Sequence, residues 1–344
     1  MLTRNRVGLE AYGVEFLRDH QLHRVTARRE VILSGGSINS PQILMLSGIG
    51  PRQELRKHQI PIVHELPVGE NLQDHILIPV DYFVNNASNI QWSRNINGIL
   101  TVRNLYNYYV HNTGPLTQLP VVITYHSSAI NDNPEWPDTI IATLTDQIGP
   151  EFLDITETMT NPLAWRSFYE GMLNDQRHFY IYYAVYRPRS RGWVKLSSAD
   201  PMDAPRINPN FFAEEHDLEL AADILSRGME LAEGEYFRKY ARIYDKTIPG
   251  CNQCPDKPYY RCNTYLRCVA QTMMTTSYHP VSTCRMGNDT ETNAVLDQYL
   301  RVRGVRNLRV IDASIMPVII NANTNAASMM IGEYGAEFVL RDRY

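Results

Sequence analysis

Residues 23–50 read HRVTARREVILSGGSINSPQILMLSGIG and predict a strand, a glycine turn and a helix. Residues 23–33 alternate and then become apolar, which is typical of a strand that enters a core. The pair Gly35-Gly36 allows a tight turn or the close approach of a ligand. The pair Ser40-Pro41 suits the N-cap and first position of a helix, and Gly48 ends it. Dinucleotide-binding layers use this strand–glycine–helix unit, although any α/β fold can contain it.

A second informative region lies near the end of the chain. Residues 278–283 read YHPVST and contain His279, and Asn323 opens the run NTN. We interpret His279 and Asn323 as two halves of one catalytic site. The apolar run at 326–331 predicts a buried helix with Asn323 and Thr324 as cap residues. Such a helix directs its N–H groups and the positive end of its dipole toward a ligand beside Asn323.

The composition is that of an ordinary globular protein. With 344 residues the chain is long enough for two domains. Its formal net charge of −4 gives no electrostatic reason to expect binding to nucleic acid or to an acidic membrane surface. No run of about eighteen apolar residues predicts a membrane span. The ten histidines contain no H-x-x-x-H pair, so we expect no metal site.

Four of the five cysteines are clustered, with the spacing C-x2-C-x7-C-x5-C. This spacing leaves disulfides, free thiols and a zinc site open, because it contains only one tight pair. Turn-forming residues in the same loop favour disulfides, which imply an oxidising compartment. We prefer the nested pairing of Cys251 with Cys268 and of Cys254 with Cys262, although a sequence does not establish connectivity.

Further elements are predicted between these regions. Residues 179–186, FYIYYAVY, predict a strand that is packed on both faces, and residues 191–196 predict another. Residues 76–130 are polar and aromatic, and we expect irregular structure with some helix there. Residues 217–232 predict a helix with one apolar stripe, formed by Leu218, Ala221, Ala222, Leu225 and Met229.

Several runs resemble motifs of the glucose–methanol–choline (GMC) oxidoreductases, which use FAD. GSINSPQILMLSGIG at residues 36–50 is similar to the second signature of that family. Further runs resemble the family in the same order along the chain: LPVGENLQDH at 66–75, SRG at 190–192, PNFF at 209–212, the His279 motif and LRVIDASIMP at 308–317. The cysteine loop before the histidine makes the chain most similar to the insect glucose dehydrogenase (FAD, quinone) branch.

The resemblance implies an FAD-dependent oxidoreductase that acts on the CH–OH group of an alcohol or a sugar, with a quinone or oxygen as electron acceptor. His279 matches the family's catalytic histidine, the base that removes the hydroxyl proton as a hydride moves to flavin N5. Asn323 would hydrogen-bond the substrate oxygen. The residues expected at the flavin are Asn325 and Ala326 at the ring, and Asp312 and Ala313, mainly through their backbone, at the ribityl-pyrophosphate part.

The expected fold is α+β. The resemblance assigns residues 1–75 and 276–344 to an incomplete α/β FAD-binding domain, and residues 76–275 to a substrate-binding domain with an antiparallel sheet. The sequence contains no G-x-G-x-x-G, which the family carries in its N-terminal part for the pyrophosphate. The chain therefore resembles the C-terminal part of a GMC enzyme. The alternative is a truncated remnant or a catalytically inactive homologue with a binding role. The cysteine loop and the resemblance together imply a secreted protein.

Three positions depart from the family pattern. Ser282 and Ala322 stand where glycine is usual, and Gly36 stands where alanine is usual. A Cβ atom at Ser282 or Ala322 conflicts with dihedrals that glycine adopts most easily. Two other residues are expected to have no catalytic role: His75 is interpreted as structural, and Ser47 lacks the G-x-S-x-G frame of a hydrolase.

We predict that the 344-residue chain on its own aggregates or binds FAD poorly. Without the central strands of a flavin-binding domain, an apolar sheet edge and helix faces would remain exposed. Expression with excess FAD, followed by gel filtration and an absorbance spectrum, checks this. A soluble protein with one flavin per chain would contradict the prediction.

Overall fold

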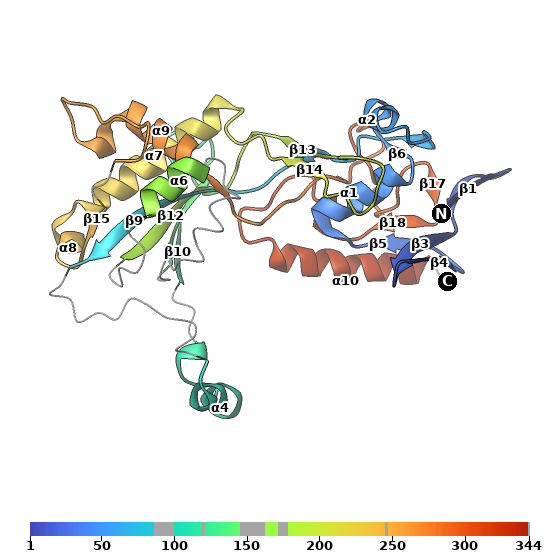
Figure 1. The fold of residues 1–344 in the computed structure, drawn as a ribbon, viewed down its shortest axis with the longest axis horizontal. Helices are drawn as coiled ribbons and strands as arrows, with labels where there is room; N and C mark the ends of the chain where they lie inside the picture. Colours follow the sequence, from blue (N-terminus) through green and yellow to red (C-terminus); the bar gives the residue numbers. More distant parts are fainter. Residues whose placement is uncertain (86–99, 118–120, 145–161, 171–177, 245–246, 343–344) are drawn as a thin grey trace. The chain divides into compact units, whose positions relative to one another are not determined.

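A computed structural model describes residues 1–85, 100–117, 121–144, 162–170, 178–244 and 247–342. The chain divides into two compact units. Unit 1 contains Met1–Asp74, Ser190–Ala213 and Tyr278–Tyr344, and unit 2 contains His75–Arg189 and Glu214–Ser277. Each unit combines helices with strands, so the predicted α+β class is confirmed (Figure 1).

The predicted strand at 23–33 is two strands in the structure, so this prediction was wrong in its extent. β4 (Gln21–Thr26) pairs antiparallel with β3 (Gly13–Arg18) in a hairpin. β5 (Val31–Leu33) instead pairs parallel with β18 (Leu308–Val310), which comes from the other end of the chain. The strand is interrupted between β4 and β5 because each of them pairs with a different partner strand.

The helix that follows, α1 (Gly36–Leu46), starts five residues earlier than we predicted from Ser40 as N-cap and Pro41 as the first helical residue. Pro41 therefore lies inside the helix and has no N–H for the Ser37 carbonyl. The Thr283 hydroxyl donates to that carbonyl instead, at 2.7 Å. A tertiary contact thus replaces the hydrogen bond that the proline removes, and α1 continues through it. The predicted end of the helix is confirmed, since Gly48 has a φ of 81°.

The remaining strands of unit 1 form small sheets. One contains β1 (Leu2–Asn5), β2 (Gly8–Ala11) and β17 (Val305–Arg306), another contains β6 (Ile49–Gly50) and β7 (His64–Glu65), and a third contains β8 (Glu70–Leu72), β13 (Gly192–Lys195) and β14 (Arg206–Asn208). The predicted strand at 191–196 is confirmed as β13. Because β13 pairs with β8, residues 190–213 belong to unit 1, although the sequence boundaries placed them with residues 76–275.

Unit 1 also contains a short helix, α2 (Arg52–Lys57), a 3-10 turn, η3 (Ala313–Ile315), and the long helix α10 (Asn325–Arg341). The prediction that this last helix is buried was wrong. Met329 is 69% exposed and Met330 is 51% exposed. Only the stripe of Ile331, Gly335 and Val339 is buried, at the spacing of one helix face. Apolar composition indicated burial on all sides, whereas this helix packs within the described chain on one side only.

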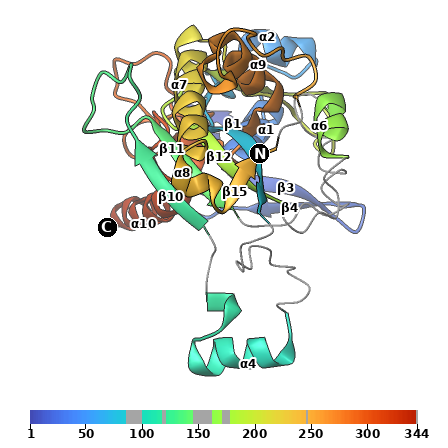
Figure 2. The same ribbon diagram turned by 90° about the vertical axis from the view of Figure 1, so that its left-hand side faces the viewer.

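Unit 2 is built on a six-stranded antiparallel sheet with the order β10-β11-β12-β9-β15, in which β16 also pairs with β9. Figure 2 labels β10, β11, β12 and β15 of this sheet. The strands are β9 (Ile76–Val84), β10 (Val121–His126), β11 (Thr139–Leu144), β12 (His178–Val185), β15 (Ala241–Ile243) and β16 (Thr275–Thr276). The helices and 3-10 turns are α4 (Val102–His111), η1 (Pro115–Thr117), α6 (Pro162–Tyr169), α7 (Glu215–Ala232), α8 (Glu235–Arg238), η2 (Tyr259–Arg261) and α9 (Asn263–Met273).

Two of the predicted elements of unit 2 are confirmed, and one is not. β12 covers nearly all of the predicted strand at 179–186, and α7 matches the predicted helix with its whole apolar stripe buried. The expectation of irregular structure from residue 76 was wrong, because β9 is a nine-residue strand. A proline such as Pro79 is rare inside a central strand, because it cannot donate a hydrogen bond to the sheet. It is tolerated because this part of β9 pairs with β12 alone, while β15 and β16 pair with the two ends.

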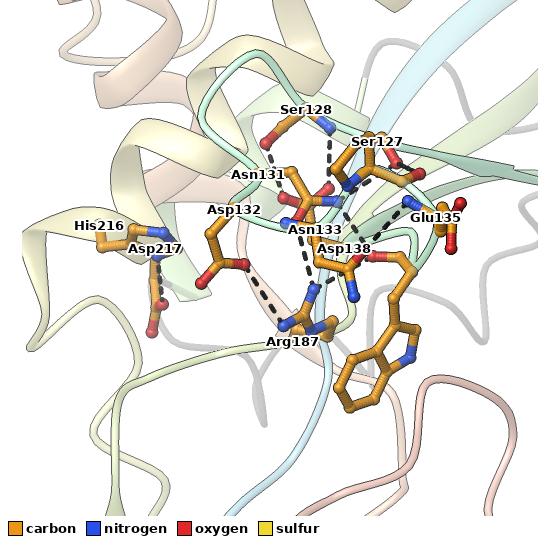
Figure 3. A network of polar contacts seen from close by, with 12 residues as sticks. Ser127, Ser128, Asn131, Asp132, Asn133, Glu135, Asp138, Arg187, His216 and Asp217 are labelled. Atoms are coloured by element: carbon orange, nitrogen blue, oxygen red, sulfur yellow. Dashed lines mark hydrogen bonds and ion pairs between the residues drawn. The ribbon is translucent and has the colours of Figure 1, made fainter.

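The loop between β10 and β11 is held by side chains rather than by strand pairing (Figure 3). The Asp138 carboxylate accepts from the N–H of Ser128 at 2.8 Å and from its hydroxyl at 2.6 Å. The Arg187 guanidinium donates to Asn131 and lies 4.2 Å from the centre of the Trp136 ring. These contacts attach the loop to the residues that follow β12.

The cysteine loop contains two disulfides, Cys251–Cys268 and Cys254–Cys262, so the nested pairing is confirmed. The fifth cysteine, Cys284, is a buried free thiol. Burial raises its pKa well above the usual value, which makes it a poor nucleophile.

We expect Gly228→Ala to destabilise unit 2 by about 1–3 kcal/mol, because the new Cβ atom would overlap the Tyr183 ring. The matched control is Gly332→Ala on α10, where a Cβ atom meets nothing within 4 Å. Alanine there should stabilise the helix by up to about 1 kcal/mol. Urea unfolding followed by circular dichroism measures both. Equal shifts of the same sign in the two variants would contradict this packing.

Candidate active site

The turn that carries His279 is fastened to a segment about two hundred residues earlier in the chain. Gln73 and Val281 form an antiparallel bridge: the Gln73 N–H donates to the Val281 carbonyl at 3.2 Å, and the Val281 N–H donates to the Gln73 carbonyl at 2.9 Å. The His279 N–H donates to the Asp74 carboxylate at 3.0 Å. Tyr278 has a φ of 57°, a left-handed conformation that reverses the chain just before His279.

The His279 imidazole is half-buried. Burial disfavours the charged ring and lowers the pKa of His279 from its usual value. A neutral imidazole carries one acceptor nitrogen. Near neutral pH the ring is therefore in the protonation state that a general base needs.

The segment that leads to Asn323 is attached to the same Gln73. The Gln73 Nε2 donates to the Pro317 carbonyl at 3.2 Å, and the Gln73 Oε1 accepts from the Ile319 N–H at 3.0 Å. Asn323 itself is exposed. The buried side chain of Gln73 thus contacts both the segment before Asn323 and, at Ser282, the turn that carries His279. Sequence reasoning gave Gln73 no role, and its place in the run at 66–75 was the only signal.

The two positions with an added Cβ atom differ in the structure. Ser282 has a φ of 79°, so the strained backbone expected there is present. Its hydroxyl accepts from the Gln73 Nε2 at 3.0 Å and donates to the Met316 carbonyl at 2.6 Å. Ala322 does not have a positive φ, so the strain that we expected at this second position is not found.

Asp312 joins the two ends of unit 1. Its carboxylate accepts from the Gly36 N–H at 3.0 Å, from the Ser40 hydroxyl at 2.6 Å and from the Ser314 N–H at 2.8 Å. These bonds attach the first turn of α1 to the residues after β18. Since both carboxylate oxygens are engaged in the fold, a cofactor beside Asp312 and Ala313 would meet mainly their backbone.

The start of α10 and the start of α1 suit a ligand with acceptor atoms. α10 begins at Asn325 with no side-chain cap, and the expected cap Thr324 makes no such bond. Asn325 and Ala326 are exposed, so the first turn presents N–H donors and the positive end of a 17-residue helix. In α1, the hydroxyl of Ser37 is buried without a hydrogen-bond partner. These features fit the polar atoms of FAD.

Other candidate residues have structural roles. His75 is fully buried and stacks on Tyr186, with ring centres 3.8 Å apart, as its structural interpretation requires. Among the residues that the structure describes, no three His, Cys, Asp or Glu side chains lie close enough to hold a metal ion. Within these same ranges, no helix is both long enough and apolar enough to cross a membrane.

Family models identify two parts of the chain. Residues 3–77 and residues 188–332 each match a model described as GMC oxidoreductase. The first match contains Gln73, and the second contains His279 and Asn323.

Curated relatives cover almost the whole chain. The chain is 31% identical over 98% of its length to glucose dehydrogenase [FAD, quinone] of Drosophila pseudoobscura pseudoobscura, of which it spans 50%. It is 32% identical over 96% of its length to the mitochondrial choline dehydrogenase of Mus musculus, of which it spans 51%. The chain therefore spans about half the length of these relatives.

Solved structures show the same fold. A formate oxidase of Aspergillus oryzae RIB40 superposes with a TM-score of 0.76 at 24% identity, over 99% of this chain and 59% of that one. A pyridoxine 4-oxidase of Mesorbium loti has a TM-score of 0.70 at 22% identity, over 95% of this chain and 54% of that one. With matching family models on both sides of the sequence and a shared fold, this chain belongs to the GMC oxidoreductase family.

Proposed function

We propose that the protein containing this chain is an FAD-dependent oxidoreductase that converts the CH–OH group of an alcohol or a sugar into a carbonyl group. The observation that carries the proposal is the attachment of the His279 turn and of the segment before Asn323 to one buried residue, Gln73. Family membership supplies the class of reaction, and the exposed start of α10 supplies donors for the cofactor.

His279 is the general base in this proposal. FAD, when bound, would supply the acceptor for the hydride that leaves the substrate carbon. The neutral imidazole takes the hydroxyl proton, so that the carbon–oxygen bond becomes a double bond. Asn323 donates a hydrogen bond to the substrate oxygen as negative charge develops there. His279 therefore removes the proton from the substrate oxygen, and Asn323 stabilises the negative charge that develops on the same oxygen.

Unit 1 is the flavin-binding part in this proposal, and the sheet of unit 2 belongs to the substrate-binding part. Asn325 and Ala326 would hold the flavin ring, and the backbone of Asp312 and Ala313 would hold its ribityl-pyrophosphate part. The names of the relatives support a quinone or oxygen as the acceptor of the electrons. The two disulfides support a secreted protein, because such bonds persist in oxidising compartments.

We expect His279→Ala to lower alcohol oxidation by at least about 100-fold while the flavin stays bound. Stopped-flow reduction of the flavin-loaded enzyme by substrate measures this. The matched control is His20→Asn in the β3–β4 turn, where φ is 60° and asparagine is tolerated. Unchanged flavin reduction in His279→Ala would remove this residue from its proposed role.

The pH profile of kcat/KM should report the pKa of His279. The base works in its neutral form, so activity falls as pH drops through its pKa. Because burial lowers that pKa, the acid limb should lie below the ordinary value of about 6.5. An acid limb above that value, or one that persists in His279→Ala, would assign the limb to another group.

Asn323→Asp should lower kcat by about 100-fold or more, because a donor is replaced by a carboxylate that repels the developing oxygen charge. Asn323→Ala removes the donor without adding charge and should retain more activity. Steady-state kinetics with one alcohol distinguishes the two. The opposite order of activities would contradict the proposed hydrogen bond.

A further inference from the structure

Gln73 is 1% exposed and lies where three distant segments of unit 1 meet. Its backbone pairs with Val281, two residues after His279. Its side chain contacts Ser282 on the same turn, and Pro317 and Ile319 on the segment that precedes Asn323. The two parts also contact each other directly, because the Ser282 hydroxyl donates to the Met316 carbonyl and the Cys284 N–H donates to the Ser314 carbonyl. The Gln73 amide adds hydrogen bonds to both parts at once.

The orientation of this amide is determined by its partners. The Ile319 N–H is only a donor, and the Pro317 carbonyl is only an acceptor, so Oε1 faces the former and Nε2 faces the latter. All polar atoms of the side chain are therefore occupied in one orientation. A residue without both a donor and an acceptor would leave a buried backbone group unpaired.

Ser282 completes the contact. Its positive φ puts the backbone in a conformation that glycine adopts at no steric cost. The Ser282 hydroxyl makes two hydrogen bonds that glycine cannot make, and these link the Gln73 amide to the Met316 carbonyl. The residue that departs from the family pattern therefore adds one hydrogen bond from the His279 turn to Gln73 and one to the segment before Asn323.

We propose that Gln73, together with Ser282, is a positioning residue that holds His279 and Asn323 in register for one substrate oxygen. The inference deepens the proposed function and rests on it. Gln73 takes no part in the proton or hydride transfer. It acts by restricting the relative movement of two segments, and a displacement of about 1 Å between reacting groups can cost about 100-fold in rate.

The first test is Gln73→Met, which keeps the length of the side chain and removes every polar atom. We expect a 10-fold to 100-fold lower kcat in the flavin-loaded enzyme, with a smaller change in KM. Independently of activity, hydrogen exchange should become faster at the Ile319 amide, which loses its acceptor. Unchanged kcat together with faster exchange would overturn the proposal.

The control is Gln42→Met on α1. Gln42 is also a buried glutamine of unit 1, and its Nε2 donates to the Asp203 carbonyl at 2.9 Å. This variant should also lose thermal stability, because the hydrogen bond from the buried amide to the Asp203 carbonyl is removed. Its kcat should not change. An equal loss of kcat in both variants would mean that general destabilisation causes the effect, and the proposal would fail.

Gln73→Glu tests the positioning role through the pH dependence of kcat, which a merely structural role of Gln73 would not change. The carboxyl keeps the shape and, when protonated, one donor. When ionised it has no donor for the Pro317 carbonyl or the Ser282 hydroxyl. Burial raises the pKa of such a carboxyl, and Asp74 beside it acts in the same direction. We expect a loss of kcat with rising pH that the parent enzyme and the Gln42→Met variant do not show. A pH profile identical to that of the parent would contradict the proposal.

Ser282→Gly separates strain from hydrogen bonding. Glycine relieves the positive φ but removes both hydroxyl contacts. We expect kcat to fall several-fold while thermal stability is unchanged or higher. An unchanged kcat would remove Ser282 from the proposed pair.

His279→Ala is measured in the same series to keep the two proposals distinct. If His279→Ala retains turnover, the proposed function fails, whatever the glutamine variants do. If His279→Ala abolishes turnover and Gln73→Met does not affect kcat, the proposed function stands and the positioning role fails.

Discussion

Unit 1 depends on buried and partly buried hydrogen bonds between segments at opposite ends of the chain. The Asp312 carboxylate binds Gly36 and Ser40, the Thr283 hydroxyl binds Ser37, and the Gln73 amide binds Ser282 across 209 residues of sequence. A polar group that is buried without a partner costs about 1–3 kcal/mol, so each of these contacts strongly favours one arrangement of the segments. The apolar core around them is less selective, because it accepts many arrangements of similar volume.

These polar contacts also decide where chemistry can occur. Gln73 and Asp74 hold the turn that contains His279, and the same glutamine holds the segment before Asn323. The Asp312 carboxylate is occupied by hydrogen bonds within the fold. The donors that remain near the expected cofactor residues are therefore its backbone and the uncapped start of α10. Residues that make hydrogen bonds within the fold and candidate functional residues therefore lie on the same segments. A substitution at a residue of the first kind changes the position of a residue of the second kind.

Local patterns predicted some elements well and others badly, for physical reasons. The apolar stripe of α7 and the aromatic run of β12 are strong periodic signals, and the structure confirms both. The start of α1 was misplaced because Pro41 normally opens a helix, whereas a tertiary bond from Thr283 to Ser37 lets the helix run through it. The exposed face of α10 shows that apolar composition reports what a helix can bury, while packing decides what it does bury.

The sequence by itself determined the family, the class of fold and the candidate pair His279 and Asn323, because short motifs and periodicities carry that information locally. The nested disulfide pairing was a preference from sequence that the structure confirmed. Tertiary structure alone decided that residues 190–213 join unit 1, that Ser282 uses its hydroxyl where glycine is usual, and that Gln73 connects the two candidate site segments. The physical reason is that a hydrogen bond between residues hundreds of positions apart leaves no trace in local pattern. Its partners become identifiable only when the chain brings a donor and an acceptor to within about 3 Å of each other.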